Sequence, residues 1–150
     1  MPKKTFLVFM LAAITIVGFS SCTKDDTISN SQELIGTWQV TGISSDMAYD
    51  WDNDGYTETD IFATYDYCQR DITLMFDEGG YGQAQQGCNA AWEHMNWQLS
   101  NNNSRLDIYM TSGDINLVVT QFNGNTIRGY DQVQANGRTY NINYTLSKQY

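Results

Sequence analysis

The sequence contains one proline, Pro2, one histidine, His94, and only eight basic residues against 17 acidic ones. So few Lys and Arg side chains argue against nucleic-acid binding, because phosphate contacts need basic residues. The same balance argues against electrostatic binding to an anionic membrane. No nucleophile elbow, phosphate-binding glycine loop or zinc spacing is present, and the lone His94 is typical of a packed or solvated residue. The sequence therefore predicts a protein that is not an enzyme.

The first 22 residues resemble the export signal of a bacterial lipoprotein. Two lysines precede an uncharged apolar run, residues 6–19, which is too short for a membrane span of ~20 residues. Small residues then lead to Cys22, as in a lipobox, although Phe19 stands where Leu is usual. We predict that residues 1–21 are a signal peptide and that Cys22 carries the lipid. The alternative is an ordinary secretory signal with an incidental cysteine.

The residues after Cys22 are polar. Residues 23–26 (TKDD) resemble the Lys-acidic-acidic tag that carries some Gram-negative lipoproteins to the outer face of the outer membrane; a plain polar tether is the alternative. We interpret residues 22–31 as a flexible tether and residues 32–150 as one domain. Removal of residues 1–21 leaves six basic against 17 acidic residues, a net charge of −11. The lipid on Cys22 is then the expected membrane partner, since acyl chains and not charge would anchor the protein.

Alternation of apolar and polar residues recurs in eight segments, which predict eight strands. Most connections are short, and Asn123-Gly124-Asn125 and Asn136-Gly137 are hairpin signals. The pattern predicts an all-β fold, an antiparallel up-and-down barrel of eight strands, because closure removes exposed edges. An open sandwich is the structural alternative. The predicted strands are residues 34–40, 72–76, 81–86, 92–99, 106–110, 115–119, 127–133 and 140–146.

Gly36-Thr37-Trp38 begins the first predicted strand, just after a short turn at residues 31–34. It is similar to the Gly-x-Trp signature of lipocalins, in which the Trp plugs the closed end of the barrel. The chain as a whole resembles the lipocalin-like lipoprotein domains of Gram-negative bacteria. These share the lipobox, the Gly-Thr-Trp start, an Asp/Asn-rich Gly loop and two spaced cysteines. The resemblance implies that Gly36 and Trp38 mark the closed end of a lipocalin-like barrel.

Two further cysteines flank a predicted hairpin. Cys68 precedes the second predicted strand and Cys88 follows the third, so the hairpin would bring both to the same end of the barrel. An exported protein folds in an oxidising compartment, which favours a disulfide between them. The alternative is a reactive or metal-binding thiol, although neither cysteine lies in a Cys-x-x-Cys motif.

Residues 50–60 (DWDNDGYTETD) contain D-x-D-x-D-G, the first half of an EF-hand calcium loop. The bidentate Glu expected at position twelve is replaced by Ile61, and Asp60 at position eleven is the predicted substitute. The alternative is a solvated acidic loop, but six acids without a base between Asp46 and Asp60 repel one another unless a counter-ion is bound. The predicted calcium ligands are Asp50, Asp52, Asp54, the backbone carbonyl of Tyr56, Glu58 and Asp60.

The residues that follow this loop have helical spacing. Ile61, Phe62 and Tyr65 would share one face, and Thr59 is a suitable N-cap. A short helix here would repeat the second half of an EF-hand, so we expect one directly after the acidic loop.

These features predict a membrane-anchored surface lipoprotein whose barrel binds a small apolar molecule, with a structural calcium ion. The rival is a non-enzymatic structural or protein-interaction lipoprotein with a filled barrel, since small barrels are often filled by their own side chains. An interior cavity of about 300 Å³ or more, open at one end and lined by Tyr, Trp and Met, favours ligand binding. A filled interior favours the interaction role.

Overall fold

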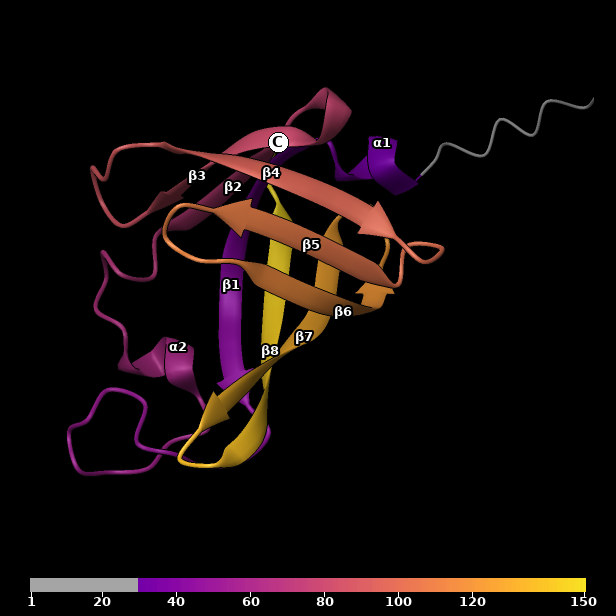
Figure 1. Ribbon diagram of the computed structural model, residues 1–150. Coiled ribbons are helices and arrows are strands. Elements are labelled where there is room, and N and C mark those ends of the chain that lie inside the picture. Colours follow the sequence, from indigo (N-terminus) through magenta and orange to yellow (C-terminus); the bar gives the residue numbers. More distant parts are fainter. Residues whose placement is uncertain (1–29) are drawn as a thin grey trace, which may run out of the picture.

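The structure, a computed structural model, describes residues 30–150, which form a closed barrel of eight antiparallel strands. Each strand pairs with its neighbours in sequence, and β8 closes the barrel by pairing with β1 (Figure 1). The predicted up-and-down barrel is confirmed, and the β1–β8 ladder excludes the open sandwich. The strands are β1 (Gly36–Ser45), β2 (Ile72–Phe76), β3 (Tyr81–Gln86), β4 (Glu93–Ser100), β5 (Arg105–Met110), β6 (Ile115–Phe122), β7 (Thr126–Ala135) and β8 (Arg138–Lys148).

Short helices lie between or before the strands. The helix predicted after the acidic loop is confirmed as α2, whereas the predicted turn before β1 is a helix, α1. The first strand begins at Gly36 rather than Leu34, because Leu34 ends α1 and its carbonyl accepts the indole N–H of Trp38 at 2.7 Å. Among the described residues, no helix is long and apolar enough to cross a membrane. The helices are α1 (Asn30–Leu34), α2 (Ile61–Thr64) and the 3₁₀ turn η1 (Glu78–Gly80).

The predicted export and lipidation features lie outside the described residues. These are the signal peptide at residues 1–21, the lipid on Cys22 and the tether at residues 22–31, of which only the last two residues are described. Those two residues belong to α1. Export and anchoring therefore stay predictions from the sequence.

One end of the barrel, which we call the closed end, is packed with aromatic side chains. Trp38 is fully buried and its ring lies 6.2 Å from that of Phe122. Phe76 and Trp97 form an edge-to-face pair with centroids 5.7 Å apart. The indole N–H of Trp97 donates to a β3 carbonyl at 2.7 Å, and that of Trp38 donates to Leu34. Both buried indoles are thus hydrogen-bonded, and the predicted core position of Trp38 is confirmed.

At the opposite end, which we call the open end, β7 and β8 extend beyond the rest of the sheet. From residue 131 onward, β7 pairs with β8 and has no partner on β6. The hairpin turns at Asn136 and Gly137, whose φ angles of 48° and 74° are those of the hairpin turns that Asn-Gly favours. The tip of this hairpin, the acidic loop and α2 lie together at the lower end of the molecule in Figure 1. Three separate segments therefore surround the open end.

Candidate functional site

The acidic loop, residues 50–60, brings together four of the predicted calcium ligands. One carboxylate oxygen of each lies within 4.8 Å of the other three. Oxygen ligands lie about 2.3–2.6 Å from a calcium ion, so oxygens on opposite sides of one ion are about 5 Å apart. The spacing therefore fits a single cation. The four clustered residues are Asp50, Asp52, Asp54 and Glu58.

Backbone N–H groups within the loop position these carboxylates. The carboxylate of Asp50 accepts the N–H of Asp54 at 3.0 Å and that of Gly55 at 3.1 Å. Gly55 has a φ of 93°, a left-handed conformation that suits glycine and turns the chain back on itself. The carboxylate of Glu58 accepts the N–H of Trp51 at 2.7 Å, across the loop. The chain therefore curls around its own acids, as D-x-D-x-D-G predicts.

Among the described residues, no basic side chain forms an ion pair with this cluster. Within residues 30–150 the one ion pair joins Arg105 and Asp107, on β5 and far along the chain from the loop. Like charges at such short range repel one another, and a cation removes that repulsion. The cluster is thus chemically suited to a hard cation.

The two other predicted ligands have different surroundings. Asp60 lies outside the cluster and caps α2, where its carboxylate accepts the N–H of Ala63 at 3.1 Å. The predicted cap, Thr59, is wrong: its carbonyl accepts the N–H of Ser45, and the next residue takes the capping place. Asp suits an N-cap as well as Thr does. Tyr56 is 77% exposed, and coordination by its carbonyl and by Asp60 stays a prediction.

Trp51 anchors the acidic loop on the extended hairpin. Its ring lies 4.8 Å from that of Tyr49 and 5.2 Å from that of Tyr140 on β8, both in edge-to-face contact. Its Nε1 is buried and has no hydrogen-bond partner among residues 30–150. An indole N–H that is buried without an acceptor costs free energy. The open end therefore contains a buried indole without a hydrogen bond, whereas both buried indoles at the closed end are hydrogen-bonded.

The barrel interior holds a cavity of about 150 Å³, which we call the barrel cavity. Its inner wall is aliphatic, and Tyr65 and Tyr144 stand where it meets the open end. A cavity of this size with aliphatic walls accepts a benzene-sized molecule. It is smaller than the ~300 Å³ at which most ligand pockets begin. The interior is thus neither filled nor wide. The aliphatic residues are Val40, Ile43, Ile72, Leu74, Ile108, Ile115, Leu117 and Leu146.

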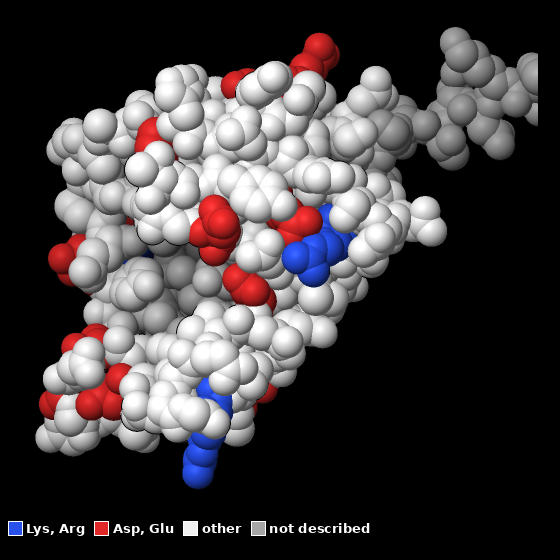
Figure 2. All heavy atoms as spheres, viewed as in Figure 1, with Lys and Arg blue, Asp and Glu red and all other residues white. Residues whose placement is uncertain are grey.

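A second hollow of about 230 Å³, which we call the outer hollow, adjoins the barrel cavity. Ile43, Tyr65 and Tyr144 border both, and Trp51 and Asp52 of the acidic loop form part of the outer wall. Figure 2 shows the surface hollowed between the strands β4–β6 and the region of α2 and the acidic loop, with acidic side chains around it. A molecule that enters the barrel cavity from this side passes the two tyrosines.

Tyr144 has an unusual electrostatic environment. Burial raises the pKa of its phenol to about 12, and the nearby carboxylate of Asp131 and the phenol of Tyr65 act in the same direction. Asp131 lies two residues after Gly129, the partner of Tyr144 in the β7–β8 ladder, and so faces the same side of the sheet. The hydroxyls of Tyr65 and Tyr144 have no hydrogen-bond partner among residues 30–150. Burial and these neighbours therefore keep the phenol of Tyr144 protonated.

The family described as Domain of unknown function (DUF5004) matches residues 19–146, which include β1–β7 and most of β8. The chain belongs to this family. No curated protein and no solved structure matches the chain. The resemblance of this DUF5004 domain to lipocalin-like lipoproteins stays a prediction, and its function has to be argued from the site.

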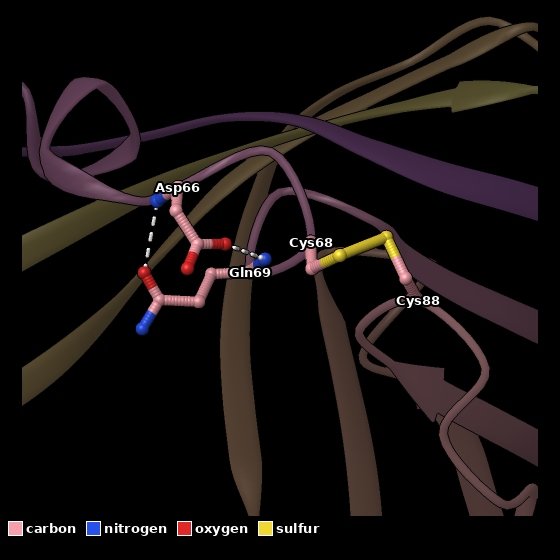
Figure 3. The surroundings of a disulfide bond; sticks show 4 residues. All are labelled: Asp66, Cys68, Gln69 and Cys88. Carbon is pink, nitrogen blue, oxygen red and sulfur yellow. Dashed lines mark hydrogen bonds between the residues drawn. A yellow bond between two sulfur atoms is a disulfide. The ribbon is translucent and has the colours of Figure 1, made fainter.

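The predicted disulfide of this DUF5004 domain is confirmed. It joins Cys68, before β2, to Cys88, after β3, with Cα atoms 4.7 Å apart. Beside it, Asp66 and Gln69 exchange two hydrogen bonds of 2.9 and 2.8 Å, each backbone N–H donating to the other side chain (Figure 3). This crosslinked turn directly follows Tyr65 in the chain. It therefore restrains the segment that carries this tyrosine.

His94 is exposed on the outer face of β4, while Met95 and Trp97 are buried on the inner face. This alternation confirms the sequence pattern. His94 borders neither the barrel cavity nor the outer hollow. That the DUF5004 domain is not an enzyme stays a prediction.

Three residues at the entrance were not predicted as site residues. Tyr144 and Asp131 carry a signal in the sequence, since period-two alternation places each on the inner face of its strand. A carboxylate on the inner face of a strand is unusual, and this position could have identified Asp131 as a candidate site residue. Tyr65 has no such signal, because it lies between α2 and β2, where its place depends on contacts with Phe62 and Arg70 and on the crosslinked turn that follows it.

Proposed function

We propose that this protein is a membrane-anchored lipoprotein of the outer-membrane surface whose barrel binds one small apolar molecule, with calcium as a structural ion in the acidic loop. The observation that carries the binding role is the apolar barrel cavity at the open end. Support for the anchor comes from the sequence up to Cys22. Support for calcium comes from the four clustered carboxylates.

The barrel cavity lowers the stability of the fold, and a bound ligand would restore the missing packing contacts. Protein interiors are close-packed, and a residual cavity destabilises a fold by about 24 cal/mol per Å³. The barrel cavity, of about 150 Å³, departs from this close packing and opens at the entrance. The interior of the closed end is filled by Trp38, Phe76 and Trp97. The barrel cavity is smaller than the expected volume of about 300 Å³ and mainly aliphatic, so it supports binding of a correspondingly small apolar ligand.

The volume of the cavity limits the ligand. About 150 Å³ accommodates a benzene-sized ring or a short alkyl group and not a whole lipid. A larger ligand would leave its remaining part in the outer hollow, beside Tyr65 and Tyr144. The proposed ligand is therefore small, with its apolar end inside the barrel.

The calcium proposal follows from the donor atoms of the acidic loop. Carboxylate oxygens without nitrogen or sulfur donors select calcium over zinc or copper. The ion would hold together the carboxylates of Asp50, Asp52, Asp54 and Glu58, whose mutual repulsion otherwise opens the loop. Extracellular calcium sites have dissociation constants on the order of 10⁻⁴–10⁻³ M, which suits a protein outside the cell. The role of the ion is structural.

The binding role is tested with iodobenzene, a benzene-sized quencher of tryptophan fluorescence, added to the domain without its lipid. We expect saturable quenching at a single site. Ile108→Phe places a ring in the barrel cavity and is expected to weaken binding at least about tenfold. Val118→Phe, the matched control, adds a ring to the outer face of β6, where Val118 is 37% exposed, and leaves binding unchanged. Linear, unsaturable quenching, or equal binding by both variants, contradicts the proposal. Circular dichroism checks that each variant folds.

The anchor is tested separately, because it does not depend on the cavity. Intact-mass measurement of the mature protein is expected to find an acylated N-terminal Cys22. Cys22→Ala is expected to leave the chain unprocessed or released from the membrane. A mature wild-type chain with a free, unacylated N-terminus at another residue contradicts lipid anchoring and leaves the binding role untouched.

A further inference from the structure

The outer hollow brings aromatic side chains from three elements to one place. Trp51 comes from the acidic loop, Tyr65 from the segment after α2 and Tyr144 from β8. The face of an aromatic ring carries partial negative charge and attracts a cation within about 6 Å of its centre. Groups of aromatic residues arranged around a pocket are typical of sites that hold an ammonium group. The outer hollow has this composition.

The lining of the two cavities is acidic. Among the described residues that border the barrel cavity and the outer hollow, none is Lys, Arg or His, whereas Asp52 borders the outer hollow. Asp131 borders neither cavity but is close enough to act on Tyr144. Its oxygens accept the backbone N–H groups of Asn116 at 3.1 Å and Gln132 at 2.7 Å, and it also interacts with Arg105. Burial is the largest cause of the raised pKa of Tyr144, and the carboxylate of Asp131, which acts in the same direction, favours a cationic ligand group over an anionic one. A fatty acid or an organic phosphate is therefore a poor match for this entrance.

The basic side chain nearest in sequence does not change this balance. Arg70 donates from Nε to the carbonyl of Tyr65 at 2.8 Å and from a terminal nitrogen to the carbonyl of Ala63 at 2.7 Å. Its guanidinium lies 6.0 Å from the centre of the Phe62 ring, and Arg70 borders neither cavity. Arg70 is engaged in holding the segment after α2 and is not placed to receive an anion in the barrel.

We propose that the ligand is a small primary amine, protonated at neutral pH, with an apolar group of about the size of a benzene ring. The apolar group occupies the barrel cavity. The ammonium group lies among Trp51, Tyr65 and Tyr144 and faces the carboxylate of Asp52. It is attracted by the nearby carboxylate of Asp131 and donates to the two phenol oxygens that lack partners among residues 30–150. This inference rests on the proposed binding function and names the chemical class of its ligand.

The test compares three compounds that share one ring and differ only in charge: benzylamine, benzyl alcohol and benzoate. Calorimetric titrations are done at pH 7 in the presence of a chelator, so that calcium in the acidic loop does not affect the result. We expect benzylamine to bind most tightly and benzoate most weakly, with about a tenfold difference between them. Equal affinities, or tightest binding of benzoate, overturn the amine inference and leave the apolar binding role standing. If none of the three binds, the binding role itself fails.

Two variants make the test specific for the entrance. Asp131→Asn removes one negative charge with little change in shape and is expected to weaken benzylamine severalfold and to leave benzyl alcohol unchanged. Glu78→Gln removes the same charge at the closed end, where Glu78 belongs to the 3₁₀ turn η1, and is expected to change neither affinity. If Asp131→Asn changes both ligands equally, its effect is structural and the proposed role of its charge is wrong. Loss of benzylamine binding in both variants also contradicts the proposal.

Discussion

Both ends of this barrel contain aromatic and charged side chains, but these have fewer hydrogen-bond and charge partners at the open end than at the closed end. At the closed end, Lys148 lies 5.4 Å from the centre of the Trp38 ring and donates to the carbonyl of Glu33 at 2.6 Å. At the open end, the described residues leave the indole N–H of Trp51 and two tyrosine hydroxyls without partners and four carboxylates without a base. Within one fold, well-packed and fully hydrogen-bonded regions contribute stability, whereas incompletely satisfied regions are often functional sites. We infer that the closed end holds the barrel together and the open end binds.

The largest expected difference comes from removing a tryptophan at the closed end. Trp38→Ala leaves a large cavity and an unbonded Leu34 carbonyl, and is expected to lower the free energy of unfolding by about 3–5 kcal/mol. Trp92→Ala is the matched control, because Trp92 is 43% exposed, and is expected to cost less than about 1 kcal/mol. Urea denaturation followed by circular dichroism measures both. If both variants lose the same free energy of unfolding, the closed end does not stabilise the barrel more than its exposed surface does.

The next effect concerns the crosslink beside Tyr65. Replacing Cys68 and Cys88 by serine opens a loop with a sequence separation of 20 residues and is expected to cost about 3 kcal/mol in the chain-entropy description. It should also weaken ligand binding, since Tyr65 loses the turn that fixes it. Urea denaturation and a ligand titration on the same sample measure both quantities. Full binding in a stable double variant would show that the disulfide does not position the entrance.

Calcium is expected to stabilise the open end and to leave the closed end unaffected. If the ion binds only the folded loop, calcium at a hundred times its dissociation constant adds about 2.7 kcal/mol to stability and raises the melting temperature. Asp52→Ala with Asp54→Ala should abolish this response without unfolding the barrel, because both residues lie outside the strands. Asp77→Ala with Glu78→Ala removes two acids at the closed end and should leave the response intact. A melting temperature that ignores both calcium and chelator means that the loop is a solvated acidic connection.

The smallest expected effect is the dependence of stability on alkaline pH. The pKa of Tyr144 is raised to about 12 from an ordinary value of 10.0, so between these values the folded state keeps a proton that the unfolded state has lost. The contribution of Tyr144 is therefore complete below pH 10 and disappears as the pH rises towards 12. Tyr144→Phe should lose stability less steeply over this range than the wild type. Identical slopes in urea denaturation series at several pH values would contradict this environment for Tyr144.

The strands could be predicted because their residues repeat with a period of two. The hairpin of β2 and β3 was placed at its observed bounds, residues 72–76 and 81–86, since its alternation is regular and a glycine turn separates the strands. The first strand was placed two residues too early, because apolar Leu34 continues the pattern although it belongs to α1. Periodicity describes a strand well and does not locate the change from a helix to a strand.

The acidic loop could be predicted and the cavity could not. D-x-D-x-D-G is a local pattern, and a local turn is sufficient to bring the carboxylates of Asp50, Asp52 and Asp54 together. The volume of the barrel cavity depends on how side chains from many strands pack against one another, and no single segment of the sequence determines that packing. For the same reason Tyr65, held by a crosslink distant in sequence, was missed, whereas Cys68 and Cys88 were paired correctly.

Binding of a small apolar molecule at the open end can be observed by titrating the methyl-labelled domain with benzene and recording nuclear magnetic resonance spectra. The methyl groups of Ile108, Leu117 and Leu146 border the barrel cavity, whereas those of Leu34 and Leu106 are equally buried but do not. We expect saturable chemical-shift changes at the first three residues and none at the other two. Shifts at all buried methyl groups, at exposed ones only, or at none would contradict the claim that the open end of this barrel binds a small apolar molecule.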